Sequence, residues 1–213
     1  FLDKIILLRN LPVIKLPDSI FLIKKGSKII TFIYSGGLTM DRGILEIVKA
    51  AESLKSNNFK LVLLGSFNSS TFKHRILSEI KFSNKIEYVP TVPYKEMLKF
   101  LVRSHVGLMC FRPTLNNLGA LSGRSNKIYE YLDAGLAVIG SDFPLWRKFI
   151  LENKIGVVVN PLKIDDIAKA MKFFIENPEK LNRTEKNAKK LSSKYSWEAE
   201  SKKLLNLYEE LSK

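Results

Sequence analysis

A basic residue and a carboxylate follow a polar, glycine-containing loop in the second half of this 213-residue sequence. The loop covers residues 122–126, and Lys127 and Glu130 stand in the helical stretch after it. A helix N-terminus presents free backbone N–H groups and the positive end of the helix dipole, which favour an anion. Lys127 would be unfavourable there unless an anion is bound nearby. A sugar nucleotide would satisfy both side chains, because it brings phosphates to Lys127 and ribose hydroxyls to Glu130.

A second candidate phosphate site is the stretch YSGGLTMDRG at residues 34–43. Gly36 and Gly37 allow a ligand to approach the backbone closely, and Arg42 can hold a phosphate through two hydrogen bonds. The spacing matches neither the dinucleotide fingerprint GxGxxG nor the P-loop GxxxxGK[ST]. Two glycines also suit a tight turn from a strand to a helix, so this stretch alone leaves both interpretations open.

The elements that must position these residues alternate between strand and helix. Continuous apolar and β-branched runs predict buried strands, and apolar residues with helical periodicity predict helices between them. Because no two neighbouring strands show a hairpin signal, we expect a doubly wound, Rossmann-like α/β fold. It would have a parallel sheet of about six strands with helices on both faces, and ligands would bind beyond the carboxyl ends of the strands. The predicted strands are residues 29–34, 61–64, 86–89, 106–111, 137–139 and 156–159.

Three parts of the chain are expected. Residues 1–28 contain prolines between short apolar runs and predict an edge or connector segment that enters the domain. Residues 29–195 form the Rossmann-like domain, and residues 196–213 form a C-terminal helix. The chain begins with Phe rather than Met, which suggests a piece of a longer protein. The expected packing face of the C-terminal helix comprises Trp197, Leu204, Leu205, Leu207, Tyr208 and Leu211.

The composition excludes several classes of protein and leaves one question open. Thirty-five basic and 21 acidic residues give a net charge of +14, which can indicate nucleic acid, an anionic membrane surface or phosphorylated substrates. The lysines are spread along helical stretches, so we expect no specific nucleic-acid partner. No apolar run could cross a bilayer, and the charged N-terminal residues argue against a signal peptide. One cysteine and the lack of HExxH, CxxC or aspartate clusters predict no disulfide, no metal and no cofactor.

Two stretches resemble a known family. SNKIYEYLDAGLAVIGSD at residues 125–142, with FPLWRKFILENKIGVVVNP after it, resembles the C-terminal half of retaining, GT-B-fold glycosyltransferases of family 4, also called group 1. Residues 34–50 resemble the first strand, phosphate loop and helix of the same half. In that family two Rossmann-like domains face each other, the C-terminal one holding the nucleotide sugar. The resemblance implies that this chain is the donor-binding half, and that a missing N-terminal domain supplies most of the acceptor site.

The resemblance also implies a role for each matching residue. Arg42 and Lys127 would be the catalytic residues and would stabilise the leaving diphosphate. Glu130 would match the second glutamate of the EX7E motif and bind ribose hydroxyls, whereas the first glutamate falls at Ser122. Gly37 stands where an arginine often follows the first loop glycine. The remaining substrate contacts would be Gly36 and Gly37 at the diphosphate, Thr91 and Val92 at the base, and Ser122, Ser125, Asn126 and Ile128 at the phosphate or sugar.

The expected function is transfer of a sugar from a nucleotide-diphosphate donor to a hydroxyl acceptor with retention, in polysaccharide or glycoconjugate biosynthesis. We expect the full-length protein to be the enzyme and the isolated domain to be inactive or weakly active. Two alternatives stay open: a sugar-nucleotide epimerase of related two-domain fold, and a non-catalytic basic docking module. The acceptor would be a sugar or a lipid-linked molecule, and the location would be cytoplasmic, with room for peripheral contact at the inner face of the membrane.

Overall fold

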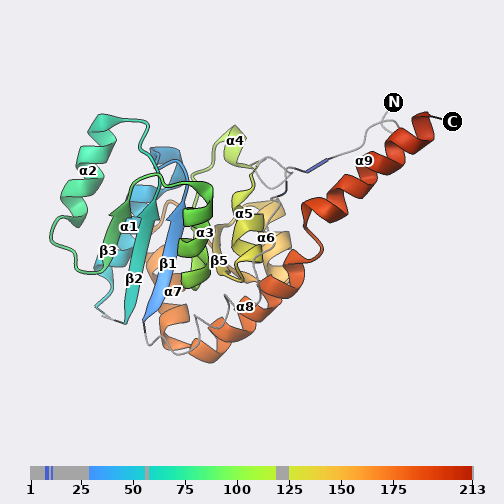
Figure 1. Cartoon of the computed structure of the whole chain (residues 1–213). Coiled ribbons are helices and arrows are strands. Elements are labelled where there is room, and N and C mark those ends of the chain that lie inside the picture. The colour runs from blue at the N-terminus through green and yellow to red at the C-terminus, as the bar shows by residue number, and fades with distance from the viewer. Residues whose placement is uncertain (1–7, 10, 12–28, 56–57, 119–124, 213) are drawn as a thin grey trace.

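The computed structural model describes residues 8, 9, 11, 29–55, 58–118 and 125–212. Within them it contains a parallel sheet in the order β3-β2-β1-β4-β5-β6 (Figure 1). This confirms the expected Rossmann-like α/β fold and the expected number of strands. The edge segment expected at residues 1–28 lies almost wholly outside the described residues. The strands are β1 (Ile30–Ser35), β2 (Phe59–Leu64), β3 (Ile86–Val89), β4 (Val106–Met109), β5 (Ala137–Ser141) and β6 (Gly156–Val159).

The two central strands of the sheet are apolar on both faces. β1 and β4 lie in the middle of the sheet, and each is buried along nearly its whole length. β1 pairs with β2 on one side, with Ile30 opposite Phe59, and with β4 on the other, with Phe32 opposite Val106. The chain runs outward in one direction from β1 and in the other from β4, so the order switches between these two strands. The loops that leave their carboxyl ends therefore diverge and leave a crevice between them.

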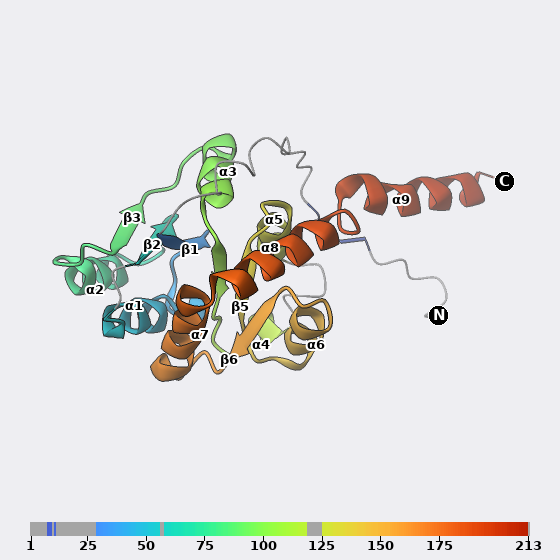
Figure 2. The ribbon, with the colours of Figure 1, turned by 90° about the horizontal axis from the view of Figure 1, so that it is seen from below.

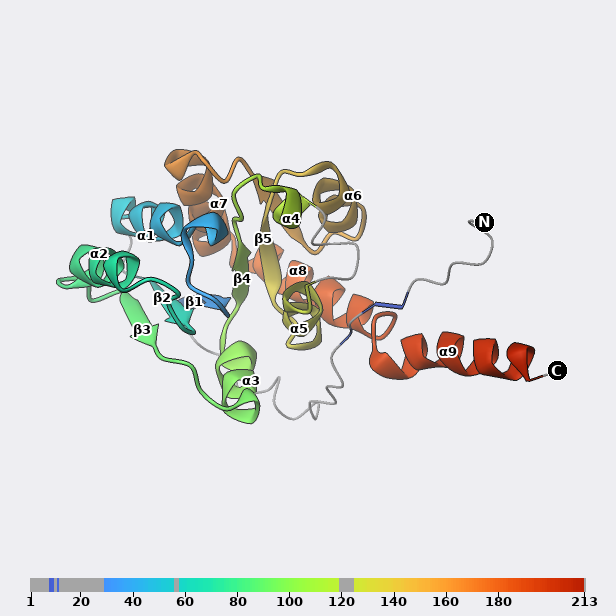
Figure 3. The ribbon, with the colours of Figure 1, turned by 90° about the horizontal axis from the view of Figure 1, so that it is seen from above.

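Helices cover both faces of the sheet. α1 (Ile44–Ser53) and α7 (Ile164–Glu176) lie on one face, and α3 (Tyr94–Arg103) and α5 (Lys127–Asp133) lie on the other (Figures 2 and 3). α1 illustrates why, because its apolar side chains recur at helical spacing and bury one stripe against the sheet. The remaining helices of the core are η3 (Met40–Arg42), α2 (Ser70–Ile80), α4 (Leu115–Leu118), α6 (Pro144–Glu152) and α8 (Pro178–Ser192).

The segment between β4 and α5 contains a short helix that the sequence pattern does not indicate. This is the four-residue helix α4, in which the Asn117 N–H donates to the Thr114 hydroxyl at 3.2 Å. A single turn of helix is too short to show helical periodicity, so the pattern could not reveal it. α4 lies at the carboxyl edge of the sheet, close to the crevice (Figure 3).

The C-terminal helix α9 (Trp197–Leu211) projects away from the sheet (Figure 1). Two of the apolar residues expected to form its packing face, Leu204 and Leu207, are partly buried. Leu205, Tyr208 and Leu211 are 58, 62 and 75% exposed, because the helix extends past the sheet and meets no core among the described residues. Its buried contact is instead polar: the Arg9 N–H donates to the Glu200 carboxylate at 2.8 Å. Among the described helices, none has the length and apolar character that crossing a membrane requires.

Candidate active site

A cavity of about 470 Å³ opens where the strand order switches, beyond the carboxyl ends of β1 and β4. Its walls come from the loop after β1 and from the segment between β4 and α5. The structure thus brings together two regions that the sequence marked separately as candidate anion sites. The cavity is lined by Tyr34, Gly37, Thr39, Asp41, Arg42, Asn116, Ser125 and Lys127.

The loop after β1 is held tightly against the end of β2. The Gly36 N–H donates to the Leu64 carbonyl at 2.9 Å, and the Leu38 N–H donates to the Ser66 carbonyl at 2.8 Å. Inside the loop, the Tyr34 hydroxyl donates to the Gly37 carbonyl at 2.8 Å. Gly36 has φ +119°, a conformation that favours glycine. These bonds fix the backbone that forms the floor of the cavity.

The Lys127 ammonium lies over this loop. Nζ is 4.4 Å from the centre of the Tyr34 ring, and a Cβ on Gly36 would lie 2.6 Å from it. A side chain at Gly36 would therefore displace the ammonium, which explains the glycine. Burial, with the positive charge of Arg42 adding to it, lowers the pKa of Lys127 to about 8, although Glu130 acts in the opposite direction. Lys127 is thus a largely protonated cation at neutral pH that water solvates poorly, and a bound anion would stabilise it.

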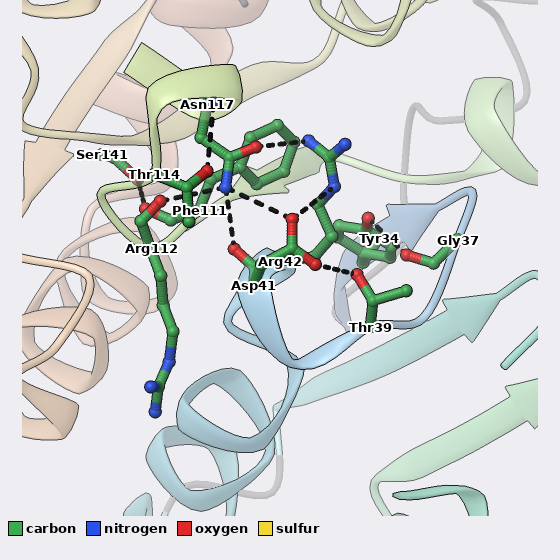
Figure 4. Close-up of polar contacts among 10 residues, drawn as sticks. All are labelled: Tyr34, Gly37, Thr39, Asp41, Arg42, Phe111, Arg112, Thr114, Asn117 and Ser141. Atoms are coloured by element: carbon green, nitrogen blue, oxygen red, sulfur yellow. Dashed lines mark hydrogen bonds and ion pairs between the residues drawn. The ribbon is translucent and has the colours of Figure 1, made fainter. Parts of the chain in front are cut away.

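Arg42 lines the same cavity as Lys127. Its guanidinium is restrained on three sides (Figure 4). Its Nη1 donates to Asn117 Oδ1 at 2.9 Å, and its Nε is 3.5 Å from Asp41 Oδ2. Its guanidinium carbon lies 4.5 Å from the centre of the Phe111 ring, a cation–π contact. The Asp41 carboxylate in turn accepts a hydrogen bond from the Thr39 hydroxyl. Arg42 is therefore a fixed cation whose charge Asp41 partly offsets.

Glu130 lies one turn beyond Lys127 on α5 and is not part of the cavity wall. Burial raises the pKa of its carboxyl, whereas Lys127 and a hydrogen bond with the Tyr94 side chain oppose that rise. Burial, together with Glu130, raises the pKa of Tyr94 to about 12, so its hydroxyl keeps its proton and can donate it to the carboxylate. The Glu130 carboxylate thus accepts a hydrogen bond from the Tyr94 hydroxyl. A side chain that binds a ribose must accept hydrogen bonds from hydroxyl groups in the same way.

The other predicted site residues lie in different surroundings. Thr91 is exposed in the turn after β3, and Val92 is partly buried against the core. Ile128 is fully buried, so its side chain belongs to the core and its backbone alone could meet a ligand. The Asn126 carbonyl accepts the Glu130 N–H at 2.9 Å and starts α5. Ser122 lies outside the described residues.

Sequence reasoning missed several polar or aromatic residues that contact the two cations or line the cavity with them. They include Tyr34, Asp41, Phe111, Asn116 and Asn117. From the sequence, Tyr34 is indistinguishable from other residues of an apolar strand, and the two asparagines are indistinguishable from loop residues. The one available signal was the length and polarity of the segment after β4, since long loops in compact domains are often functional.

The sequence matches the family model described as glycosyl transferases group 1 over residues 19–191. The chain belongs to this family. Its membership confirms the resemblance that the stretch around Lys127 indicated. No curated protein matches the sequence as a whole.

Several solved structures share the fold at low sequence identity. Sucrose-phosphate synthase from Thermosynechococcus elongatus is 18% identical, with a TM-score of 0.73 over 91% of this chain and 48% of its own. The C-terminal domain of the group 1 protein LpcC from Francisella tularensis is 17% identical, with a TM-score of 0.69 over 87% of this chain and 97% of that domain. HepE from Anabaena, solved in complex with UDP, is 11% identical, with a TM-score of 0.71 over 92% of this chain and 54% of its own. This chain spans about half the length of the first and third of these proteins.

Proposed function

We propose that this chain is the donor-binding half of a retaining glycosyltransferase that transfers a sugar from a nucleotide-diphosphate donor to a hydroxyl acceptor. The observation that carries the proposal is that two cations, Arg42 and Lys127, line one cavity at the switch in strand order. Contacts with neighbouring side chains hold both cations in place without a bound ligand. A diphosphate is the part of a sugar nucleotide that such a pair would bind.

The proposed chemistry needs charge stabilisation more than a nucleophilic side chain. As the bond between the anomeric carbon and the diphosphate oxygen breaks, negative charge grows on the leaving diphosphate. Fixed cations in a site of low polarity stabilise that charge without reorganising. α5 has only seven residues, so its dipole is small and the two side chains would supply most of the positive potential. This chemistry requires neither a metal nor a cofactor.

The remaining donor contacts follow from the same placement. We propose that Glu130 binds the ribose hydroxyls, that the backbone at Thr91 and Val92 meets the base, and that Gly36 and Gly37 allow the diphosphate close to the backbone. Ser122, Ser125, Asn126 and Ile128 would complete the contacts to phosphate or sugar. HepE, whose structure holds UDP, shares this fold and supports a nucleotide in this crevice.

The rest of the enzyme would supply the acceptor. Family membership favours transfer over epimerisation, and over a purely non-catalytic module. The comparison proteins that are about twice as long suggest a second domain, so we expect little or no transfer by these 213 residues alone. We place the protein in the cytoplasm, with peripheral membrane contact if its acceptor is lipid-linked.

The first test is titration of the chain with UDP, GDP and ADP, in which calorimetry and thermal shift measure binding. We expect one of them to bind, and Arg42→Ala to weaken it by about tenfold, since a hydrogen bond to a charged group is worth about 1.5–3 kcal/mol. Arg147→Ala is the matched control, because Arg147 pairs with Asp142 outside the cavity and is 54% exposed at its side chain. No binding of any of the three nucleotides would refute the proposed donor site.

A second test concerns the ribose. We expect Glu130→Gln to weaken binding of the ribonucleoside diphosphate by about tenfold, because a neutral amide is a poorer acceptor than a carboxylate. The same substitution should leave the affinity for the 2′,3′-dideoxy analogue nearly unchanged, since that ligand has no hydroxyls to donate. Equal losses for both ligands, measured by calorimetry, would show that Glu130 does not contact the ribose.

A further inference from the structure

Asn117 is a polar side chain with no exposed surface, and it connects three segments around the cavity. Its Oδ1 accepts the hydrogen bond from Arg42 Nη1 at 2.9 Å. Its Nδ2 donates to the Arg112 carbonyl at 2.9 Å and to the Asp41 carbonyl at 3.1 Å. We infer that Asn117 is a positioning residue that fixes the Arg42 guanidinium for the donor diphosphate, an inference that rests on the proposed function.

The orientation of the Asn117 amide is determined by its neighbours. Both of its N–H groups point at backbone carbonyls, which are acceptors only (Figure 4). Turning the amide over would place its oxygen against those carbonyls and its NH2 group against the guanidinium of Arg42. The first of these contacts would bring two acceptors together, and the second would bring two donors together. Oδ1 therefore has to face Arg42, and the backbone of two other segments holds it there.

The consequence for Arg42 is a guanidinium that three described neighbours restrain. Nε faces Asp41, Nη1 faces Asn117, and one face of the guanidinium plane lies on the ring of Phe111. Within the part of the chain that the structure describes, the other N–H groups of Arg42 have no partner, and Arg42 lines the cavity. Holding a long side chain in its bound rotamer before the ligand arrives removes an entropic cost from binding.

An asparagine suits this task because its oxygen is a neutral acceptor. A carboxylate in the same place would cancel the charge of Arg42, which the diphosphate needs, and it would have no N–H group to donate to the two carbonyls. Arg42 already shares its charge with Asp41, whose carboxylate also accepts from Thr39. Arg112, which provides one of the carbonyls, sends its own side chain away from the cavity to Glu46 (Figure 4). Among the described cationic side chains, Asn117 thus acts on Arg42 alone.

The test is a double-mutant cycle on nucleoside diphosphate binding to this chain, with wild type, Asn117→Ala, Arg42→Ala and the double variant. We expect Asn117→Ala to weaken the diphosphate by about five- to tenfold and to have no further effect once Arg42 is alanine. The affinity for the free nucleoside, followed by NMR titration, should stay the same in all four. Asn153→Ala is the matched control. It removes an amide whose Nδ2 donates to the Phe149 carbonyl at 2.8 Å, and neither residue lines the cavity.

Three results would overturn the inference. They are a wild-type affinity for the diphosphate in Asn117→Ala, additive losses in the double variant, and an equal loss of nucleoside affinity, which would indicate a merely structural role. If Asn117→Ala does not fold, Asn117→Ser decides, because serine keeps a donor but is too short to reach Arg42. A wild-type chain that binds no diphosphate defeats the proposed function as well, whereas a loss in Arg42→Ala without one at Asn117 defeats this inference only.

Discussion

Lys127→Met is expected to weaken nucleoside diphosphate binding by about 100-fold and to raise the Tm of the unliganded chain. The loss should exceed that of Arg42→Ala, because Lys127 is the less solvated cation and Asp41 offsets part of the charge of Arg42. The gain in stability follows from the same burial, which disfavours the charged ammonium and lowers its pKa to about 8. Replacing a buried charge by an apolar side chain of similar length often stabilises a protein, here by about 1–2 kcal/mol.

The pH dependence of both effects has a definite sign. The pKa of Lys127 is lowered from its ordinary value of 10.5 to about 8 by folding, so between these values the unfolded chain binds more protons than the folded one. Stability relative to Lys127→Met should therefore rise as the pH increases from about 8 to 10.5, and the full cost of the buried charge is present below pH 8. Diphosphate affinity should fall over the same interval, because the ammonium loses its proton.

Urea unfolding and calorimetry at pH 7, 8, 9 and 10 would measure these effects. Lys202→Met is the matched control, since Lys202 is exposed on α9, far from the cavity. It should change neither the diphosphate affinity nor the pH profile. A Lys127→Met chain that binds the diphosphate like wild type would contradict the assignment of Lys127 to the leaving group. If the stability of Lys127→Met equals that of wild type, only the predicted cost of burying the Lys127 ammonium is contradicted.

Gly65→Ala is expected to lower the stability of the fold by about 3 kcal/mol or more, through backbone strain and overpacking. Gly65 follows β2 with φ +145°, and a Cβ there would overlap the carbonyl oxygen of Gly36. Its own N–H donates to the Val89 carbonyl at 2.9 Å, so the residue cannot move away without losing that bond. Either the end of β2 or the Gly36 loop must shift. Because Lys127 Nζ sits against Gly36, the folded fraction should also bind the diphosphate more weakly.

Gly37→Ala provides the comparison for stability. Gly37 lies beside Gly36 in the loop after β1, but the nearest heavy atom to an added Cβ would be Thr39 Cγ2 at 3.9 Å, an ordinary contact. Its Tm should stay near that of wild type, whereas that of Gly65→Ala should fall by about 6 °C or more, at roughly 2–4 °C per kcal/mol for a domain of this size. Thermal unfolding followed by circular dichroism measures both. Equal Tm values for the two variants would contradict the close approach of the two loops.

Much of the fold could be predicted because its signals are local. Apolar runs such as the one in β1 and the glycine turns that follow them depend on neighbouring residues, so the alternation of strands and helices was readable in order. The parallel sheet and its switch point then followed from general rules of chain connection. The same reasoning marked Arg42 and Lys127, because a cation beside a glycine loop or a helix start is unusual without an anion.

The environment of those two cations was decided by the tertiary structure alone. Asn117 meets Arg42 across 75 residues of sequence, and the Tyr34 ring meets Lys127 because β1 and β4 are neighbours in the sheet. The exposed apolar side of α9 has a similar origin, since an amphipathic pattern specifies a face and not the surface that the face will reach. The sequence by itself determined the α/β fold and the two candidate anion sites. Their union into one cavity, and the groups that restrain each charge, depend on strand order and register, which no short-range pattern encodes.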